Sequence, residues 1–319
     1  MRFGLSTLTH NVFSTADSYI AVAEAAERAG FDFMSVSDHL VVPGQLDSHY
    51  PYVVGGAFRI ASHGHCFDML STIAFLAGIT KRIRLLTSVL VVPYRPAMLT
   101  AKMLATIDVL AKGRLIVGVG AGWMKEEFEL LDANFPDRGR VTDEHVAAFI
   151  ELWTKDRASF SGQHVNFSNA IFAPKPVQKP HPPIWVGGES APAIRRSIKL
   201  GNVWYPGNNS QTRPLDTTAR LATGIAEVRR QCEAVGRDPK SLGIALLVQD
   251  HFEWADHKVS DGSARRMFTG TSADMAADAE ALSAIGVEDV ALRLGGATVE
   301  EAVARIERFG AEVIAKRKA

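Results

Sequence analysis

Short runs rich in β-branched residues alternate with longer helical patterns along the chain, and this alternation narrows the choice of fold. The predicted strands are Arg2–Ser6, Phe33–Ser37, Ile83–Val89, Leu115–Val119, Pro183–Val186, Asn202–Trp204, Leu242–Val248 and Val287–Leu294. The predicted helices are Ala16–Ala29, Met69–Gly78, Ala97–Ala111, Met124–Leu131, Val146–Thr154, Pro192–Leu200, Pro214–Ala234, Ser272–Ile285 and Glu300–Lys316. Eight strands that each precede a helix are typical of an α/β fold, the (β/α)₈ TIM barrel; a doubly wound open sheet is the alternative.

Two helix ends carry recognisable capping signals. Gly30 follows the first predicted helix at a position that favours a left-handed backbone conformation. Ser272 is the expected N-cap of a later helix, with the acidic Asp274 in its first turn. Both signals support the helical assignments on which the barrel depends.

Two segments interrupt the alternation and predict insertions. Leu40–His65, after the second strand, is rich in Pro, Gly, His and Tyr. Phe160–Val177, before the fifth strand, alternates apolar and polar residues as a hairpin does. Because loops that follow barrel strands lie on the catalytic face, we expect the first insertion to shape a substrate pocket. No linker or repeat divides the chain, so we expect one domain over residues 1–319.

Charge and cysteine content exclude several classes of protein. The 35 Lys and Arg balance 35 Asp and Glu, which argues against nucleic-acid binding by bulk charge. The same balance gives no polybasic surplus for binding to an anionic membrane. The two cysteines, Cys66 and Cys232, form no disulfide lattice, and no apolar run approaches the roughly 18 residues of a membrane span. The N-terminal residues lack the apolar core of a signal peptide, so the sequence predicts a cytoplasmic enzyme.

A carboxylate and an imidazole stand together at the end of the second predicted strand, as Asp38 and His39. Barrel active sites are built at this end of the strands, and a histidine exchanges protons near neutral pH. The structural alternative is an aspartate that caps the following loop, with the histidine packed beneath it.

Two glycine-rich turns follow later strands. Gly118, Gly120 and Gly122 permit close backbone approach, but Trp123 stands where the dinucleotide fingerprint needs its last glycine. The segment from Gly187 to Ser190 runs into a helix, whose first N–H groups suit a phosphate. A tight turn and a serine-capped helix are the structural alternatives.

Other motifs carry weaker signals. Ser88 and Val89 end the third strand, where small residues let a flat ring approach the backbone; a buried strand is the simpler interpretation. His63 and His65 form a His-x-His pair in the first insertion and suggest a metal-dependent hydrolase as a remote alternative. The chain lacks the Gly-x-Ser-x-Gly elbow of serine hydrolases.

Taken in order, these segments resemble the luciferase-like monooxygenase superfamily, the bacterial luciferase-like flavin and deazaflavin oxidoreductases. The resemblance covers Met1 to about Gly207 and rests on Gly30–Leu40, Arg82–Leu90, Pro96–Leu115, Gly118–Phe128 and Pro182–Ala191. Within the superfamily, Asp38–Pro43 and Tyr50–Tyr52 are most similar to the branch that uses coenzyme F-420.

This resemblance implies a barrel with insertions that binds FMN or a deazaflavin at the carboxyl ends of its strands. It places Asp38 and His39 beside the cofactor ring and Ser88 and Val89 against its face, across a backbone bulge. It places along the cofactor, or at its phosphate, Gly120, Ala121, Gly122, Gly187, Gly188, Glu189 and Ser190. A homodimer is also expected from the resemblance.

The chain departs from the sugar-phosphate dehydrogenases of this superfamily at two positions. Trp123 stands in place of their acidic proton donor, and Pro43 in place of a tryptophan. We therefore expect a small, apolar or aromatic substrate that contacts Trp123 and Pro43.

The hypothesis drawn from these residues is a hydride transfer between a reduced cofactor and an organic substrate. His39 acts as acid or base and Asp38 orients it. Coenzyme F-420 is the expected cofactor and FMN is the alternative; FMN implies a monooxygenase with a separate flavin reductase as partner. A non-catalytic flavin-binding protein is a further alternative.

Overall fold

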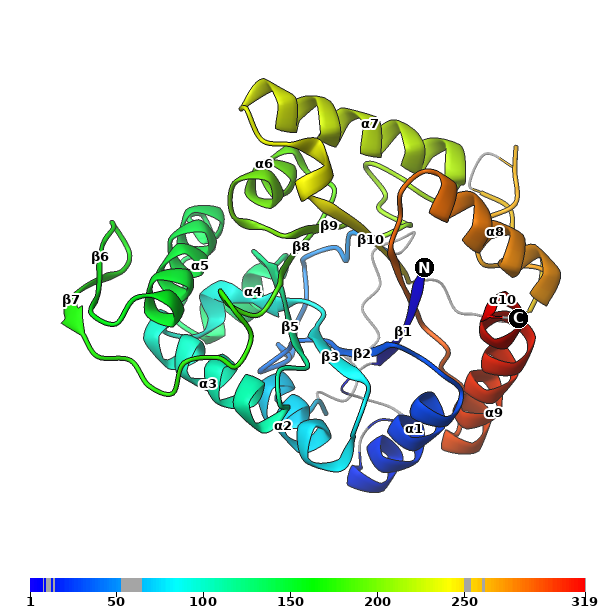
Figure 1. Cartoon of the computed structure of the whole chain (residues 1–319), viewed down its shortest axis with the longest axis horizontal. Coiled ribbons are helices and arrows are strands. Elements are labelled where there is room, and N and C mark those ends of the chain that lie inside the picture. The colour runs from blue at the N-terminus through cyan, green and yellow to red at the C-terminus, as the bar shows by residue number, and fades with distance from the viewer. Residues whose placement is uncertain are drawn as a thin grey trace.

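The computed structural model describes residues 1–7, 9, 13, 15–52, 65–249, 254–259 and 262–318. Its strands form a ring at the centre of the molecule, with helices around it (Figure 1). The barrel strands are β1 (Arg2–Thr7), β2 (Phe33–Val36), β3 (Arg84–Thr87), β4 (Leu90–Val91), β5 (Leu115–Gly120), β8 (Ile184–Gly187), β9 (Val203–Tyr205), β10 (Gly243–Val248) and β11 (Asp289–Leu292). The order and positions of the predicted strands are confirmed.

The sheet closes on itself through β3, β4 and β5. Its order is β3-β2-β1-β11-β10-β9-β8-β5-β4, and β3 also pairs with β5. Leu85 of β3 lies opposite Leu115, and Leu90 of β4 lies opposite Val119, so β3 and β4 share one of eight positions in a parallel barrel. The (β/α)₈ TIM barrel is therefore confirmed, and the open sheet is excluded.

The helices cover the outside of the ring. They are α1 (Ala16–Arg28), α2 (Met69–Ile79), α3 (Ala97–Leu110), α4 (Lys125–Leu130), α5 (Arg138–Thr154), α6 (Ala191–Leu200), α7 (Thr218–Ala234), α8 (Ser272–Ala284), α9 (Val299–Phe309) and α10 (Ala315–Lys318). Three predictions need correction: α5 begins eight residues before the predicted Val146, α7 begins four residues after the predicted Pro214, and a π-helical turn at Gly310–Ile314 separates α9 from α10.

The capping predictions have different outcomes. Gly30 has φ of 83°, as a left-handed helix end requires. The N-cap of α8 is Thr271 rather than Ser272: its side chain accepts from the Asp274 N–H, and the Asp274 carboxylate binds the Thr271 N–H in return. Thr271 is the N-cap, and not Ser272, because this reciprocal capping box satisfies two backbone donors.

Large side chains fill the inside of the barrel below the strand ends. Phe33 and Trp185 are almost fully buried there, with ring centroids 5.5 Å apart. A Cβ on Gly4 would come within 2.0 Å of the Phe33 ring, so only glycine leaves space for this phenyl group. The packed interior gives the cavity above it a fixed floor.

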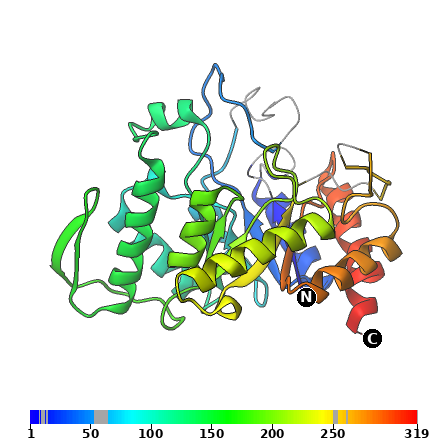
Figure 2. The ribbon, with the colours of Figure 1, turned by 90° about the horizontal axis from the view of Figure 1, so that it is seen from above.

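Both predicted insertions are present. The second is an antiparallel hairpin of β6 (Ala158–Ser161) and β7 (Asn166–Ala170), which begins earlier and ends earlier than the predicted Phe160–Val177. The described part of the first insertion follows β2 and rises on the side opposite the two chain termini (Figure 2). Because the strands are parallel, this is the side of their carboxyl ends.

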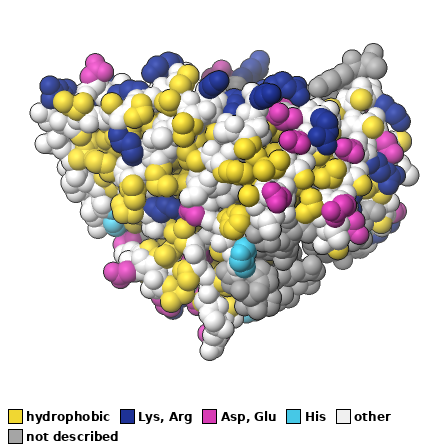
Figure 3. Space-filling view, turned by 90° about the horizontal axis from the view of Figure 1, so that it is seen from below, with side chains coloured by type: hydrophobic (Ala, Val, Ile, Leu, Met, Phe, Trp, Pro, Cys, Tyr) yellow, Lys and Arg dark blue, Asp and Glu magenta, His cyan; other side chains and the backbone are white. Residues whose placement is uncertain are grey.

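Exposed apolar side chains gather on the outer face of α2 and α3 (Figure 3). They are Phe75, Ile79, Met98, Leu99, Val109 and Leu110. In the part of the chain that the structure describes, no helix combines the length and the apolar character that crossing a membrane would require.

Candidate functional site

A cavity of about 550 Å³ opens at the carboxyl ends of the barrel strands. Most of the predicted site residues line it: Asp38, His39, Ser88, Val89, Gly120, Ala121, Gly122, Trp123, Gly187, Gly188 and Ser190. Pro43 and Glu189 are buried but do not line the cavity. Segments far apart in the sequence therefore converge on one site, as the barrel requires.

Val89 projects into the cavity between two glycines. The peptide bond between Ser88 and Val89 is cis and lies where β3 gives way to β4. A Cβ on Gly120 would come within 2.6 Å of the Val89 side chain, and one on Gly187 within 3.0 Å. A side chain at Gly120 would displace Val89 and one at Gly187 would press against it, so the two glycines leave room for the apolar Val89 side chain at the cavity wall.

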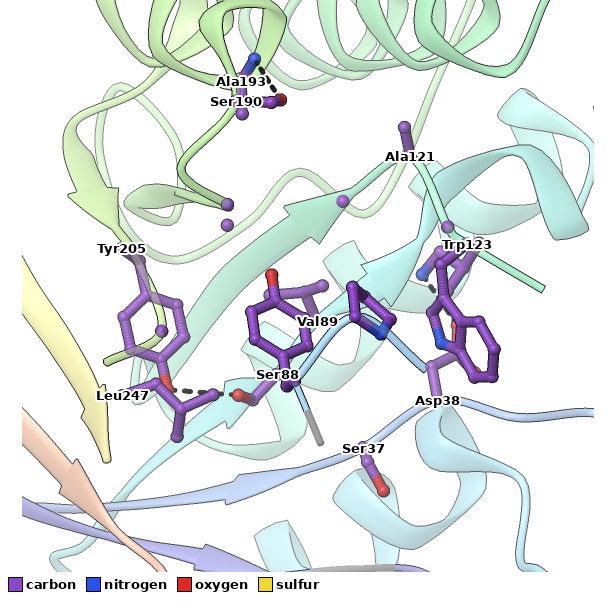
Figure 4. Close-up of a pocket in the computed structure, with 18 of the residues that line it drawn as sticks. Ser37, Asp38, Ser88, Val89, Ala121, Trp123, Ser190, Ala193, Tyr205 and Leu247 are labelled. Atoms are coloured by element: carbon purple, nitrogen blue, oxygen red, sulfur yellow. Dashed lines mark hydrogen bonds between the residues drawn. The ribbon is translucent and has the colours of Figure 1, made fainter. Parts of the chain in front are cut away.

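A tyrosine holds the Ser88 side chain in place beside this part of the cavity wall. Its hydroxyl lies 3.1 Å from the Tyr205 hydroxyl at the end of β9. Figure 4 shows this pair on one side of the view, with Trp123 and Asp38 on the other and Ser190 and Ala193 at the start of α6. Burial raises the pKa of Tyr205 well above its ordinary value, so the phenol stays protonated.

The ring of His39 is held by Glu127, a residue that was not predicted. The Nδ1 atom of His39 lies 2.8 Å from the Glu127 carboxylate, which is fully buried. Glu127 also accepts hydrogen bonds from the Tyr94 hydroxyl (2.8 Å) and the Leu40 N–H (2.7 Å). Burial raises the pKa of Glu127, but these donors outweigh it and bring the pKa below its ordinary value. A charged Glu127 assigns the proton of neutral His39 to Nδ1, which leaves Nε2 as an acceptor.

Asp38 does not have the orienting role that was predicted for it. Both of its carboxylate oxygens accept from Arg95, each at 2.8 Å, and one also accepts from the Val91 N–H at 2.9 Å. Arg95 binds Asp68, the N-cap of α2, at 2.8 Å as well. Asp38 thus ties the end of β2 to β4 and α2, and the orienting carboxylate is Glu127.

The first turn of α6 keeps backbone donors available at the cavity. Ser190 is its N-cap, which was the structural alternative for this segment, and accepts from the Ala193 N–H at 3.4 Å. The Gly188 N–H instead donates to the Tyr205 carbonyl at 3.3 Å, so it is not available to a phosphate. Within the described residues, the N–H groups of Ser190 and Ala191 have no acceptor. These two amides are the donors that an anion would meet.

Two arginines that were not predicted line the same end of the cavity. Arg138 opens α5 and donates to the Gly122 carbonyl at 3.2 Å. Arg196 of α6 binds the Asp143 carboxylate and, at 2.9 Å, the Gly139 carbonyl. The starts of α5 and α6 therefore meet at this end of the cavity, where the helix dipoles add to the guanidinium charge of Arg138, while Asp143 pairs with that of Arg196.

Glu189 faces away from this end. Its carboxylate accepts from the Gly207 N–H and from the Tyr52 hydroxyl, the latter at 3.3 Å. Burial raises its pKa, and the hydrogen bond from Gly207 only partly opposes that shift. Glu189 therefore joins the β8 turn to the first insertion, which explains why it does not line the cavity.

Aromatic residues from the first insertion cover the cavity. The Tyr50 ring lies 5.1 Å from the Trp123 ring, and its hydroxyl donates to Gln249 at 3.0 Å. Tyr50 also packs edge-on against Tyr52, with centroids 5.6 Å apart. Trp123 lines the cavity, whereas Pro43 does not.

The two histidines of the metal hypothesis belong to the first insertion. His63 lies outside the described residues, and His65 packs against Phe67 with ring centroids 5.7 Å apart. Over the described ranges, no group of three His, Cys, Asp or Glu side chains could hold a metal ion.

Three proteins illustrate what this chain is similar to. An uncharacterized protein of Mycobacterium tuberculosis (strain ATCC 25618 / H37Rv) is 32% identical over 219 residues, 69% of this chain and 73% of that protein. The FMNH(2)-dependent dimethylsulfone monooxygenase of Pseudomonas putida is 30% identical over 230 residues, 71% of this chain and 56% of that protein. The coenzyme F420-dependent tetrahydromethanopterin reductase of Methanopyrus kandleri superposes with a TM-score of 0.71 at 16% identity, covering 99% of both chains, which indicates a shared fold.

The sequence profile of the family described as luciferase-like monooxygenase matches residues 1–312. Because the match extends over nearly the whole sequence, the chain belongs to the luciferase-like monooxygenase family.

Proposed function

We propose that this protein is an oxidoreductase that moves a hydride between a reduced flavin or deazaflavin and a small organic substrate. The observation that carries the proposal is the cradle of Val89, Gly120 and Gly187, where an apolar side chain and two residues without side chains line the cavity and leave room for a planar ring. When bound, the cofactor supplies the hydride and the protein supplies orientation, a dry cavity and proton handling.

The residues of the site divide these tasks. Ser190 and Ala191 present N–H groups to the cofactor phosphate, and Arg138 adds positive charge at the same end of the cavity. Nε2 of His39 exchanges a proton with the reacting substrate, while Glu127 keeps the imidazole in one tautomer. Trp123 and Tyr50 shield the cavity from water.

Two cofactors fit this arrangement, and each has a supporting observation. The residues from Asp38 to Pro43 resemble the branch that uses coenzyme F-420. FMN is supported by the similarity to a protein named as an FMNH(2)-dependent monooxygenase. With FMN the reaction would be a monooxygenation that consumes oxygen, in place of hydride transfer to the substrate, and a separate flavin reductase would supply the reduced FMN. FMN also needs fewer cations than the polyanionic tail of a deazaflavin, and neither Lys125 nor Arg195 lines the cavity.

Titration of the purified protein with each cofactor tests the proposal, with Gly188→Val as the informative variant. Gly188 has φ of 106°, and a side chain there would press on Ala193, 3.3 Å from the new Cβ. We expect the wild type to change the absorption and fluorescence of one cofactor at 1:1 stoichiometry. Gly188→Val should lose that cofactor on desalting, because the turn that feeds α6 is displaced.

Gly236→Val is the matched control. Gly236, just past the end of α7, also has positive φ, 75°, but a Cβ there would have nothing within 4 Å among the described residues. The two variants should lose similar backbone stability, while only Gly188→Val loses cofactor. Equal cofactor retention in both variants would show that the β8 turn is not the phosphate site.

A further inference from the structure

A glutamine at the end of β10 lines the cavity apart from the proposed cofactor cradle. Gln249 directly follows β10 and lies two residues beyond Leu247, which packs against the barrel interior. Because alternate residues of a strand share one face, both side chains point inward, and both line the cavity. The cradle residues Val89, Gly120 and Gly187 come instead from the ends of β3, β5 and β8. Gln249 therefore belongs to a different part of the cavity wall.

The Gln249 amide is oriented by a tyrosine of the first insertion. The Tyr50 hydroxyl donates to Gln249 Oε1 at 3.0 Å, and it also hydrogen-bonds to the side chain of Arg293. A guanidinium can only donate, so Arg293 uses the phenol oxygen and leaves the phenol proton for Gln249. Burial raises the pKa of Tyr50 and the Arg293 charge opposes this only partly, so the phenol keeps its proton. The oxygen end of the amide is therefore occupied, and the nitrogen end is turned away from Tyr50.

The nitrogen of this amide is a donor without a protein acceptor. Within the described ranges, Gln249 hydrogen-bonds only through its Oε1 atom and through its backbone N–H, which donates to Asn208 at 3.1 Å. Unlike the side-chain atoms that are both unpaired and closed off, such as Arg293 Nε and the Ser37 hydroxyl, the Nε2 atom of Gln249 stays accessible at the cavity. It is therefore a donor that a ligand in the cavity can reach.

A glycine leaves open space in front of this donor. Gly207, two residues after β9, also lines the cavity. A Cβ on Gly207 would lie 3.2 Å from Gln249 Nε2 and 3.1 Å from the Tyr52 ring. Gly207 does not have positive φ, so its backbone conformation does not demand glycine. What the missing side chain provides is room for a ligand atom beside Nε2.

The surroundings of this space favour an uncharged ligand atom. The same Cβ position lies 3.4 Å from Oε1 of Glu189, whose carboxylate accepts from the Gly207 N–H and the Tyr52 hydroxyl. An anion placed there would make ionisation of Glu189 more costly, whereas a neutral oxygen adds no charge. A neutral acceptor therefore fits the space between Gln249 and Glu189 better than an anion does.

We propose that Gln249 is a specificity-determining residue, whose Nε2 donates a hydrogen bond to a neutral oxygen acceptor of the substrate. This inference rests on the proposed function and adds one polar contact to the expected apolar substrate. A donor that is held in place by Tyr50 loses its water when a ligand enters, so a ligand without an acceptor leaves it unpaired. Gln249 then selects for molecules that carry such an oxygen on an apolar body.

Titration with two ligands of the same shape tests this role. Cyclohexanone carries a neutral acceptor oxygen, and methylenecyclohexane has a CH₂ group in its place. Ligand-observed NMR gives both affinities, and their ratio removes effects of cavity size and apolar contact. Gln249→Met keeps the length of the side chain and removes the donor. We expect it to lower the affinity for cyclohexanone, relative to methylenecyclohexane, roughly 3- to 10-fold, the range of one net hydrogen bond.

Two further variants separate the donor from its surroundings. Tyr50→Phe removes the bond to Gln249 Oε1 but keeps the Nε2 donor, so the affinity ratio should fall less than in Gln249→Met. Gln163→Met is the matched control, because Gln163 is exposed in the β6–β7 hairpin and does not line the cavity. It should leave the ratio at the wild-type value.

Each titration is run on cofactor-free protein and on protein loaded with whichever of FMN or coenzyme F-420 it retains. An unchanged ratio in Gln249→Met, an equal fall in Tyr50→Phe, or no binding of cyclohexanone to wild type overturns the role of Gln249. So does a loss of cofactor affinity in Gln249→Met that matches its loss of cyclohexanone, since the amide would then serve the cofactor. Failure of every cofactor to bind would instead contradict the proposed function, while the cofactor-free titrations still test Gln249.

Discussion

Replacing His39 with alanine is expected to lower turnover about 10²- to 10⁴-fold, the usual contribution of a positioned acid or base. His39 lines the cavity, and its Nδ1 is bound by Glu127, so Nε2 is the atom that we propose exchanges a proton with the substrate. Cofactor affinity should change little, because the proposed phosphate donors are the amides of Ser190 and Ala191. Steady-state turnover and cofactor titration on the same preparation provide the two measurements.

His181→Ala is the control for this variant. His181 lies outside the cavity and its Nδ1 contacts the Pro182 carbonyl, so turnover should stay at the wild-type level. Wild-type turnover in His39→Ala would remove His39 from the mechanism. A parallel loss of cofactor binding would instead make His39 part of the cofactor site.

The second large effect is expected for Glu127→Gln. The amide cannot accept all the hydrogen bonds that His39, Tyr94 and Leu40 now donate to the carboxylate. We expect the imidazole to lose its fixed tautomer and kcat to fall toward that of His39→Ala, with KM little changed. The double variant should be no slower than His39→Ala alone, because the two residues act as one unit.

The free energy of unfolding of Glu127→Gln should depend on pH in a direction that can be predicted. The pKa of Glu127 lies below its ordinary value of 4.5, so the carboxylate stabilises the folded state above that pH. That contribution is lost as the pH falls through the lower, folded-state pKa. Glu127→Gln should cost about 1–3 kcal/mol at neutral pH, and its deficit should narrow at acidic pH. Denaturant unfolding at several pH values measures both.

Glu129→Gln is the matched control on the same helix, since Glu129 is exposed and pairs with Lys125. It should leave kcat and the pH dependence of stability unchanged. If Glu127→Gln loses stability but keeps wild-type kcat, Glu127 is structural and does not position His39.

The order of elements was predictable from the sequence because each barrel strand carries its own apolar run and each helix its own periodicity. The glycine cradle was predictable in part, since Gly120 and Gly187 stand at strand ends where small residues have few other uses. The N-cap residue is harder to predict from the sequence: Thr271 and Ser272 are both good N-caps, and the reciprocal bond with Asp274 decides between them.

The partner of His39 could not be found from local sequence. Asp38 is adjacent in the chain, but successive residues of an extended segment point to opposite sides, and Asp38 turns toward Arg95. Glu127 is 88 positions away and meets His39 only because α4 follows β5. A signal was available in the stretch Gly118–Phe128, where Glu127 is an acidic residue beside the apolar Phe128.

The arginines that line the cavity could not be identified from local sequence either. Lys125, Arg195 and Arg293 are as basic as Arg138 and Arg196, and only the fold selects which of them line the cavity. Arg196 lies one residue after Arg195 on α6, so helical geometry turns one toward the cavity and the other away.

A structure of the protein with its cofactor bound tests the central claim most directly. The account predicts a tricyclic ring with one face against Val89, and a phosphate within hydrogen-bond distance of the Ser190 and Ala191 amides. A ring bound away from Val89, or a phosphate held elsewhere than the start of α6, would contradict it.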